Sequence, residues 1–300
     1  MKLRTQQNNR MQITGKTKLL GIIGNPIEHS MSPVIQNKAL QALGLDYVYI
    51  PFQVAKEDLA TVFAGFKGVN LIGFNVTIPH KQNVIPLLTN ISDTAKMIGA
   101  VNTVWLTEDG WHGTNTDIDG FIAPLRRIDR DWSQITPLVL GNGGASRAVI
   151  VGCNQLGCPE IKIVGRNLDK LKAFQESWQD SGLTSKISIY LWDELNDQNL
   201  IAESGLIVNT TPIGMYPHIN DSVLTMEQNQ LIQPDTIVYD LIYTPRPTLF
   251  LQQAQQQGAI IIDGSEMLVE QGAVGFKIWT GQDAPVEVMG RTLKAKLGLP

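Results

Sequence analysis

Cysteine is scarce in this chain, and its scarcity excludes two classes of protein. Only two of the 300 residues are cysteines, and Cys153 and Cys158 form a C-x4-C pair with no further cysteines near them. Such a pair completes neither a zinc site nor a disulfide framework. Metal-ligand spacing is also missing from the four histidines, which are His29, His80, His112 and His218. We therefore expect reduced, partly buried thiols, no metal site and a cytoplasmic protein.

Long apolar runs and excess positive charge are missing as well. No run approaches the roughly 18 apolar residues that span a bilayer, and the polar start MKLRTQQNNRMQITGK is unlike a signal peptide. The net charge of -4 provides no general attraction to nucleic acid or to an anionic membrane. We expect neither as a partner, so an anionic small molecule would need a local site. Residues 1–15 are interpreted as a mobile tail.

The composition that remains is that of a globular protein with a sizeable core. Hydrophobic residues make up 43% of the chain and charged residues 17%. Short apolar runs alternate with helical patterns, which is typical of an α/β fold with mainly parallel strands. We predict two domains. Residues 16–119 and about 270–300 form the first, because the last helical segment has no strand of its own to cover, and residues 120–269 form the second.

Local signals in the first domain predict where three segments begin or turn. Ser32 is expected to cap a helix whose first residue is Pro33. Pro79 is expected to open another helix after the apolar run LIGFNVT, which would place Lys81 in its first turn. Residues 108–110, Glu-Asp-Gly, are the predicted turn of a hairpin.

A glycine-rich loop opens the second domain. GNGGAS, residues 141–146, follows the strand-like run PLVL and precedes a helical pattern. Gly141 and Gly143 can provide the tight turn and the close approach to a pyrophosphate at the helix N-terminus. Ser146 replaces the third glycine of G-x-G-x-x-G, and a glycine cluster can also be an ordinary turn. Its place between strand and helix favours a dinucleotide site.

The charge at the end of the next strand favours NADP over NAD. The run IKIVG ends at Arg166, where an NAD-binding domain usually has an acidic residue for the ribose hydroxyl. An arginine suits a 2′-phosphate, and Lys170 follows within one helical turn. An exposed arginine at a strand end is the alternative interpretation.

Eight motifs together resemble the shikimate dehydrogenase family over nearly the whole chain from about Lys18. The motifs are GNPIEHSMSP (24–33), GFNVTIPHK (73–81), GAVNT (99–103), GTNTD (113–117), GNGGASRA (141–148), NTTPIGM (209–215), DLIYTP (240–245) and GSEMLVEQGA (264–273). The resemblance implies reversible, NADPH-dependent reduction of 3-dehydroshikimate to shikimate, a step of aromatic amino-acid biosynthesis. It implies an N-terminal α/β substrate domain with a mostly parallel sheet, a Rossmann-like NADP-binding domain, and a site between them. It leaves a homodimer open.

The resemblance also implies roles for individual residues. Lys81 and Asp117 would be the catalytic pair, and Ser30 and Ser32 would bind the substrate carboxylate. The other implied substrate contacts are Thr77, Asn102, Tyr243 and Gln271. The implied cofactor contacts are Gly141, Asn142, Gly143, Gly144, Ala145, Arg166, Lys170, Thr210, Met215, Leu241, Gly264 and Met267. The family usually has Asn-Arg-Thr where this chain has Gly165-Arg166-Asn167, which alters the side chains beside the arginine.

The chemistry of ketone reduction gives an independent reason for the predicted pair. Hydride addition to a ketone leaves an oxyanion, which needs a positive or proton-donating group in place. The Lys81 ammonium can be that group, and Asp117 can hold it in position.

Other interpretations remain open for single residues and for the whole chain. Asp117 alone would be a helix cap, and Met215 and Met267 would be core residues. A quinate/shikimate dehydrogenase that uses NAD or both cofactors is the alternative enzyme. A non-catalytic shikimate-binding regulator of the same fold is the alternative from another class.

Overall fold

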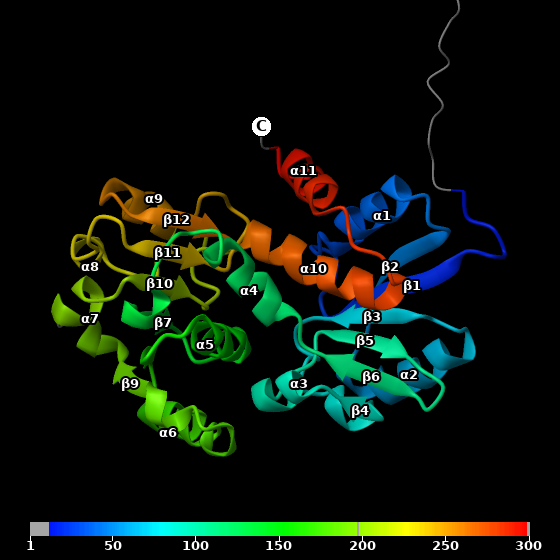
Figure 1. The fold of residues 1–300 in the computed structure, drawn as a ribbon, viewed down its shortest axis with the longest axis horizontal. Helices are drawn as coiled ribbons and strands as arrows, with labels where there is room; N and C mark the ends of the chain where they lie inside the picture. Colours follow the sequence, from blue (N-terminus) through cyan, green and yellow to red (C-terminus); the bar gives the residue numbers. More distant parts are fainter. Residues whose placement is uncertain (1–11, 197, 299–300) are drawn as a thin grey trace, which may run out of the picture.

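Two six-stranded sheets lie side by side in the computed structural model (Figure 1). The structure describes residues 12–196 and 198–298. Most of the segment interpreted as a mobile tail, residues 1–11, lies outside the described residues. The two sheets, each with its own helices, confirm the predicted α/β fold.

The first sheet is mostly parallel, as predicted. Its order is β2-β1-β3-β5-β6-β4, and only β5 runs against its two neighbours. Strands β5 and β6 form the predicted hairpin. The strands are β1 (Lys18–Gly24), β2 (Tyr47–Gln53), β3 (Gly73–Val76), β4 (Asn90–Ile91), β5 (Thr103–Leu106) and β6 (Trp111–Thr114). The helices of this half are α1 (Ser32–Ala42), α2 (Leu59–Gly68), α3 (Asp93–Ile98) and α4 (Asp117–Leu125).

The second sheet is entirely parallel, with the order β12-β11-β10-β7-β8-β9. The chain moves outward from β7 through β8 to β9 and then crosses to β10, which is the doubly wound pattern of nucleotide-binding domains. The strands are β7 (Pro137–Leu140), β8 (Ile161–Gly165), β9 (Ile187–Leu191), β10 (Leu206–Asn209), β11 (Ile237–Asp240) and β12 (Ile260–Asp263). The helices are α5 (Gly144–Leu156), α6 (Leu168–Glu176), α7 (Gln198–Ala202), α8 (Met226–Asn229) and α9 (Leu249–Gln256).

The last two helices, α10 (Gly264–Thr280) and α11 (Val286–Lys296), return to the first sheet as predicted (Figure 1). Phe276 and Met289 belong to the same buried cluster as Leu20 of β1. The Trp279 indole also donates a 2.9 Å hydrogen bond to the Val104 carbonyl of β5. The division into domains stays a prediction; its boundaries at residues 119 and 270 fall inside α4 and α10.

Two of the local predictions were wrong. No α-helix begins at Pro79: Lys81 lies in a turn, because its carbonyl accepts a 2.8 Å hydrogen bond from the Val101 N–H rather than continuing a helical ladder. Pro86, which lacks an N–H, leaves only a 3₁₀ turn over Ile85–Leu87. Ser32 is not the N-cap of α1 but its first residue, so Pro33 stands second.

Helices α4 and α10 cross between the two sheets and touch through their backbones (Figure 1). Gly120 makes this approach possible. A Cβ atom at Gly120 would lie 2.6 Å from the Met267 carbonyl oxygen and 2.9 Å from the Gln271 Cβ. The backbone oxygen cannot move aside as a flexible side chain could, so any side chain at position 120 would force the two helices apart.

Gly120→Ala is therefore expected to lower the free energy of unfolding by about 1–3 kcal/mol, the usual range for overpacking a buried contact. Gly65→Ala is the matched control, because α2 has open space around that Cβ position and alanine is the better helix former. Denaturant unfolding of both variants measures the difference. Equal stability of the two variants would contradict the close contact.

Asp240 is a buried carboxylate at the end of β11. It accepts hydrogen bonds from the Thr248 hydroxyl (2.7 Å), the Asn209 amide (3.0 Å) and the Ile242 N–H (3.1 Å). These bonds join the end of β11 to the last residue of β10 and to the segment between β11 and α9. Burial is the main reason that the pKa of Asp240 is raised to about 6; the hydrogen bonds lower it and the charge of Asp263 raises it.

Asp240→Asn is expected to change how stability depends on pH. In the folded wild type the pKa of Asp240 lies above its value in the unfolded chain. The contribution of the protonated carboxyl to the free energy of unfolding is therefore complete below about pH 4 and is lost as the pH rises through about 6. The stability of the variant relative to wild type should therefore rise between pH 4 and 7.5, by up to about 3 kcal/mol. Denaturation curves across this range, with exposed Asp180→Asn as control, test it. Parallel pH profiles for Asp240→Asn and wild type would contradict it.

Candidate active site

Lys81 and Asp117 meet as an ion pair. The Lys81 Nζ lies 2.5 Å from Asp117 Oδ2. Lys81 comes from the turn after β3 and Asp117 is the first residue of α4, where Thr116 takes the N-cap position. The Asp117 carboxylate therefore does not cap the helix, and its side chain is only 14% exposed, against 30% for Lys81. The pair is sheltered, but the ammonium still reaches solvent.

Asn102 holds the other oxygen of the carboxylate. Its amide nitrogen donates to Asp117 Oδ1 at 2.8 Å and lies 3.4 Å from Gln271 Oε1 of α10. Its amide oxygen accepts from the Thr116 N–H at 2.8 Å. Asn102 is buried, so these bonds determine both the position and the flip state of its side chain. Four predicted site residues, Lys81, Asn102, Asp117 and Gln271, thus form one cluster.

Sequence reasoning missed the buried residues that support this cluster. The Asn75 side chain donates hydrogen bonds to the Asn102 carbonyl (3.0 Å) and to the Thr103 hydroxyl (3.1 Å). It accepts a 2.7 Å hydrogen bond from the Tyr49 hydroxyl. Burial raises the pKa of Tyr49 well above its usual value, so this hydroxyl remains a donor. The available signal was a polar residue, Asn75, inside the apolar run LIGFNVT, where a buried amide needs partners.

Ser30 and Ser32 follow the carboxyl end of β1, and Thr77 directly follows β3, which is the neighbour of β1 in the sheet. The Ser30 hydroxyl accepts the Ser32 N–H at 3.3 Å. The loops after the two strands are joined by a 3.0 Å bond from the Asn25 N–H to the Ile78 carbonyl. The predicted carboxylate contacts therefore lie at the same sheet edge as the turn that carries Lys81.

Tyr243 lies on the loop after β11, in the other half of the molecule. Burial raises the pKa of its hydroxyl. Within residues 12–196 and 198–298, no hydrogen bond joins Tyr243 to Lys81 or Asp117. The structure does not bring this predicted substrate contact together with the cluster.

The glycine loop forms the turn between β7 and α5. Gly141 has a φ of +108°, and a Cβ there would lie 2.8 Å from the Thr210 hydroxyl, so glycine is required. Gly143 and Gly144 have open space around their Cβ positions, and they and Ala145 are exposed at the start of α5. Their backbone amides can therefore meet an anion. Ser146, at the third glycine position, is buried and donates 2.6 Å to the Gly143 carbonyl.

Arg166 and Lys170 are exposed at the carboxyl end of β8 and in the first turn of α6. Asn167 caps α6 by accepting the Lys170 N–H at 2.9 Å. Threonine is also a common N-cap residue, so this departure from the family pattern preserves the local backbone. No carboxylate among the described residues forms an ion pair with Arg166, which leaves its guanidinium available to a phosphate. Asn142, in the glycine loop, lies beside Gly165, the last residue of β8.

The residues predicted near the nicotinamide come from three segments at the carboxyl ends of β10, β11 and β12. The Thr210 hydroxyl donates 2.9 Å to the Leu140 carbonyl. Met215 is 43% exposed, which is unlike a core methionine. Gly264 begins α10 so close to β11 that a Cβ would lie 2.0 Å from the Leu241 carbonyl oxygen. Met267, partly buried, follows one turn later on α10.

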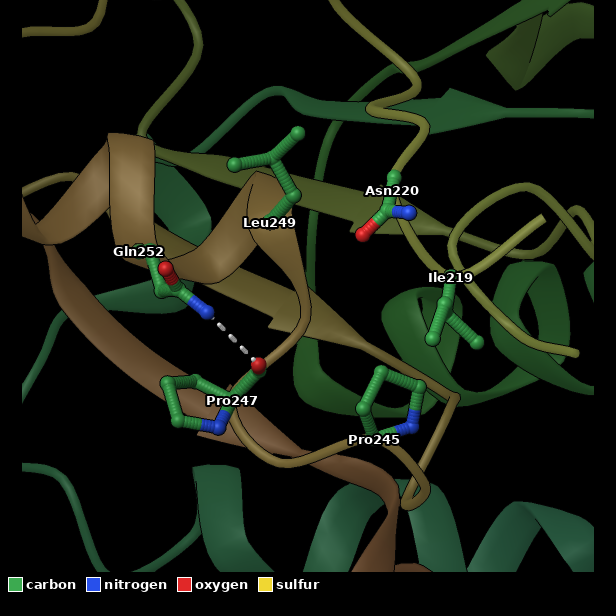
Figure 2. Close-up of a pocket in the computed structure, with 6 residues that line it drawn as sticks. All are labelled: Ile219, Asn220, Pro245, Pro247, Leu249 and Gln252. Atoms are coloured by element: carbon green, nitrogen blue, oxygen red, sulfur yellow. Dashed lines mark hydrogen bonds between the residues drawn. The ribbon is translucent and has the colours of Figure 1, made fainter.

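A separate pocket of about 260 Å³ lies between the loops that follow β10 and β11 (Figure 2). In it the Gln252 amide donates 3.0 Å to the Pro247 carbonyl. Its lining residues are Ile219, Asn220, Pro245, Pro247, Leu249 and Gln252. None of them is a predicted contact, so we assign the pocket no part in the site.

Neither a metal site nor a membrane span was found in the part of the chain that the structure describes. No three His, Cys, Asp or Glu side chains gather there as metal ligands could, and none of its helices is both long and apolar enough to cross a bilayer. Cys153 and Cys158 are free thiols, and both are buried.

Comparison with known proteins gave matches at both ends of the chain and across it. One family model, described as the shikimate dehydrogenase substrate binding domain, matches residues 22–104. Another, described as the shikimate 5′-dehydrogenase C-terminal domain, matches residues 264–294. A curated relative from Gloeothece citriformis, named shikimate dehydrogenase (NADP(+)), is 55% identical over 287 residues, which cover 96% of this chain and 99% of the relative.

Solved structures give the same result. Shikimate 5-dehydrogenase from Listeria monocytogenes, in complex with shikimate and NAD, has a TM-score of 0.86 and 34% identity, covering 94% of this chain and 98% of its own. A shikimate dehydrogenase in complex with NADP+ has a TM-score of 0.87 and 37% identity, covering 95% and 98%. With relatives this similar along almost its whole length, the chain belongs to the shikimate dehydrogenase family.

Proposed function

We propose that the protein is an NADP-dependent shikimate dehydrogenase that reversibly reduces 3-dehydroshikimate to shikimate. The observation that carries the proposal is the 2.5 Å Lys81–Asp117 pair, held by Asn102 in a chain of this family. An acid-base pair of this kind suits interconversion of a ketone and an alcohol.

Shikimate is proposed to bind at the carboxyl ends of β1 and β3. Ser30 and Ser32 would donate their hydroxyl groups to the substrate carboxylate beside the start of α1, where free N–H groups also favour an anion. Thr77, Asn102 and Gln271 would contact the ring hydroxyls. Tyr243 would approach from the other half when the two halves close around the substrate.

The residues around the glycine loop fit NADP. The exposed amides of Gly143, Gly144 and Ala145 would hold the pyrophosphate, while Gly141 and Asn142 shape the turn. Arg166, with Lys170 one turn away, would bind the 2′-phosphate. Thr210, Met215, Leu241, Gly264 and Met267 would surround the nicotinamide. When bound, NADPH supplies the hydride for the reduction.

Lys81 is proposed to act at the oxygen that becomes the alcohol. As negative charge develops there, the ammonium stabilises it and can pass a proton to it. Asp117 holds the ammonium in position, and Asn102 holds the Asp117 carboxylate, so the ammonium does not have to be oriented during the reaction. Because Lys81 is 30% exposed, the proton can be replaced from solvent. In the reverse direction Lys81 takes the proton from the hydroxyl.

The predicted domain division is kept as part of this proposal, with residues 16–119 and 270–300 binding the substrate and residues 120–269 binding NADP. The sequence leaves a homodimer open, and the cytoplasmic location stays a prediction.

Lys81→Ala is expected to lower kcat for NADP+-linked oxidation of shikimate by about 10²–10⁴, the usual contribution of a general acid or base. NADP+ affinity should not change, because no hydrogen bond or ion pair in the described residues joins Lys81 to the glycine loop. Lys67→Ala, at an exposed position on α2, is the matched control. NADPH absorbance measures the rates. Full activity in Lys81→Ala would defeat the catalytic role, and shikimate binding without turnover in the wild type would favour the non-catalytic regulator.

Arg166→Gln is expected to raise the KM for NADP+ by about 10- to 100-fold, the effect of losing a charge-assisted hydrogen bond. The KM for NAD+ should stay the same, because NAD+ has no 2′-phosphate. Arg291→Gln on α11 is the matched surface control. Equal changes for both cofactors would count against Arg166 as the phosphate contact. Faster wild-type turnover with NAD+ and quinate would favour the alternative enzyme.

A further inference from the structure

The five residues 98–102 form a template on which both members of the catalytic pair are held. The Val101 N–H donates 2.8 Å to the Lys81 carbonyl. The Ala100 carbonyl accepts a 3.1 Å hydrogen bond from the side-chain amide of Asn115. The side-chain oxygen of Asn115 in turn accepts a 2.9 Å hydrogen bond from the Asp117 N–H. The Asn102 side chain binds the Asp117 carboxylate. A shift of this template would therefore move Lys81 and Asp117.

Arg147, in the first turns of the cofactor helix α5, reaches the beginning of the template. Its Nε donates to the Ile98 carbonyl at the end of α3, one of the carbonyls that a helix end leaves without a helical partner. Its guanidinium also donates a 2.9 Å hydrogen bond to the Ser177 hydroxyl and lies 4.4 Å from the centroid of the Trp178 ring. One side chain thus binds both halves of the molecule.

The surroundings of Arg147 make this contact directional. Burial lowers the pKa of the guanidinium from its usual value, and within the described ranges no carboxylate pairs with it. Its partners are the rings of Phe174 and Trp178, the Ser177 hydroxyl and the Ile98 carbonyl. A partly buried cation without a counter-ion depends on polar groups and aromatic faces for its stabilisation. The Ile98 carbonyl is therefore held at the position that the Arg147 N–H group faces.

We propose that Arg147 is a positioning residue that couples the cofactor helix to the Lys81–Asp117 pair through residues 98–102. The inference rests on the proposed function. Arg147 touches neither member of the pair, and its effect passes through the backbone of the template. Displacement of the template would misalign the ammonium with the substrate oxygen, and catalysis is sensitive to shifts of about 1 Å.

The test compares Arg147→Met with Ser177→Ala. Methionine keeps an unbranched apolar side chain against Trp178 but cannot donate to Ile98. Ser177→Ala removes two hydrogen bonds within the cofactor half, the one from Arg147 and the one that Ser177 donates to the Phe174 carbonyl, and leaves the bond to Ile98 in place. For Arg147→Met we expect kcat to fall about 10- to 100-fold, with the KM values for NADP+ and shikimate within about threefold of wild type and a shifted pH profile of kcat. Ser177→Ala should keep wild-type kinetics.

Each other result overturns the inference. An unchanged kcat and pH profile in folded Arg147→Met, with a lower thermal midpoint alone, would show a structural role. A higher KM for NADP+ at unchanged kcat would make Arg147 a cofactor contact. Equal losses of kcat in both variants would place the effect in the cofactor half. Inactivity of the wild type would instead refute the proposed function, so the two failures are distinguishable.

Discussion

The close contact between α4 and α10 is the constraint on which the rest of the arrangement depends. Helix α4 begins with Asp117, and α10 carries Met267 and Gln271. Both helices connect the two sheets along the chain, and they approach closely because position 120 has no side chain. Their contact fixes the distance at which the Gln271 amide oxygen meets Asn102, and it sets where the second half of the molecule begins relative to the Lys81–Asp117 pair.

The polar cluster around Asn102 depends on burial as much as on charge. Exposed ion pairs contribute little because water screens them and their side chains remain mobile. Here Asp117 receives a bond from Asn102, Asn102 is held by Thr116, and Asn75 is held by Tyr49. Each of these three side chains has a hydrogen-bond partner, so the Lys81 ammonium meets a carboxylate that is already oriented. The arrangement provides order before the substrate arrives, which is what a reaction with developing charge requires.

Much of this was predictable from local sequence, and the failures have a common cause. The parallel second sheet, the hairpin and the glycine turn were predicted because apolar periodicity, turn residues and glycine act over a few positions. The helix expected at Pro79 was wrong because the Lys81 carbonyl is taken by Val101, twenty residues away in the chain. Asn75 and Tyr49 were missed for the same reason, since 26 residues separate the two side chains that bond. Patterns along a chain do not reveal which distant partner takes a polar group.

Two positions depart from an expected motif, Ser146 from the dinucleotide fingerprint and Asn167 from the family pattern, and at both the side chain hydrogen-bonds to the nearby backbone. Ser146 stands where the dinucleotide fingerprint has its third glycine, and its buried hydroxyl donates a hydrogen bond to the Gly143 carbonyl. Asn167 takes the helix cap beside Arg166, a task that threonine also performs. In both places the side chain bonds to a backbone group three residues away, next to the backbone that would meet the dinucleotide. At these two positions the hydrogen bond that the side chain makes supports the local turn, whereas the proposed role of Arg166 is to select the cofactor by its charge.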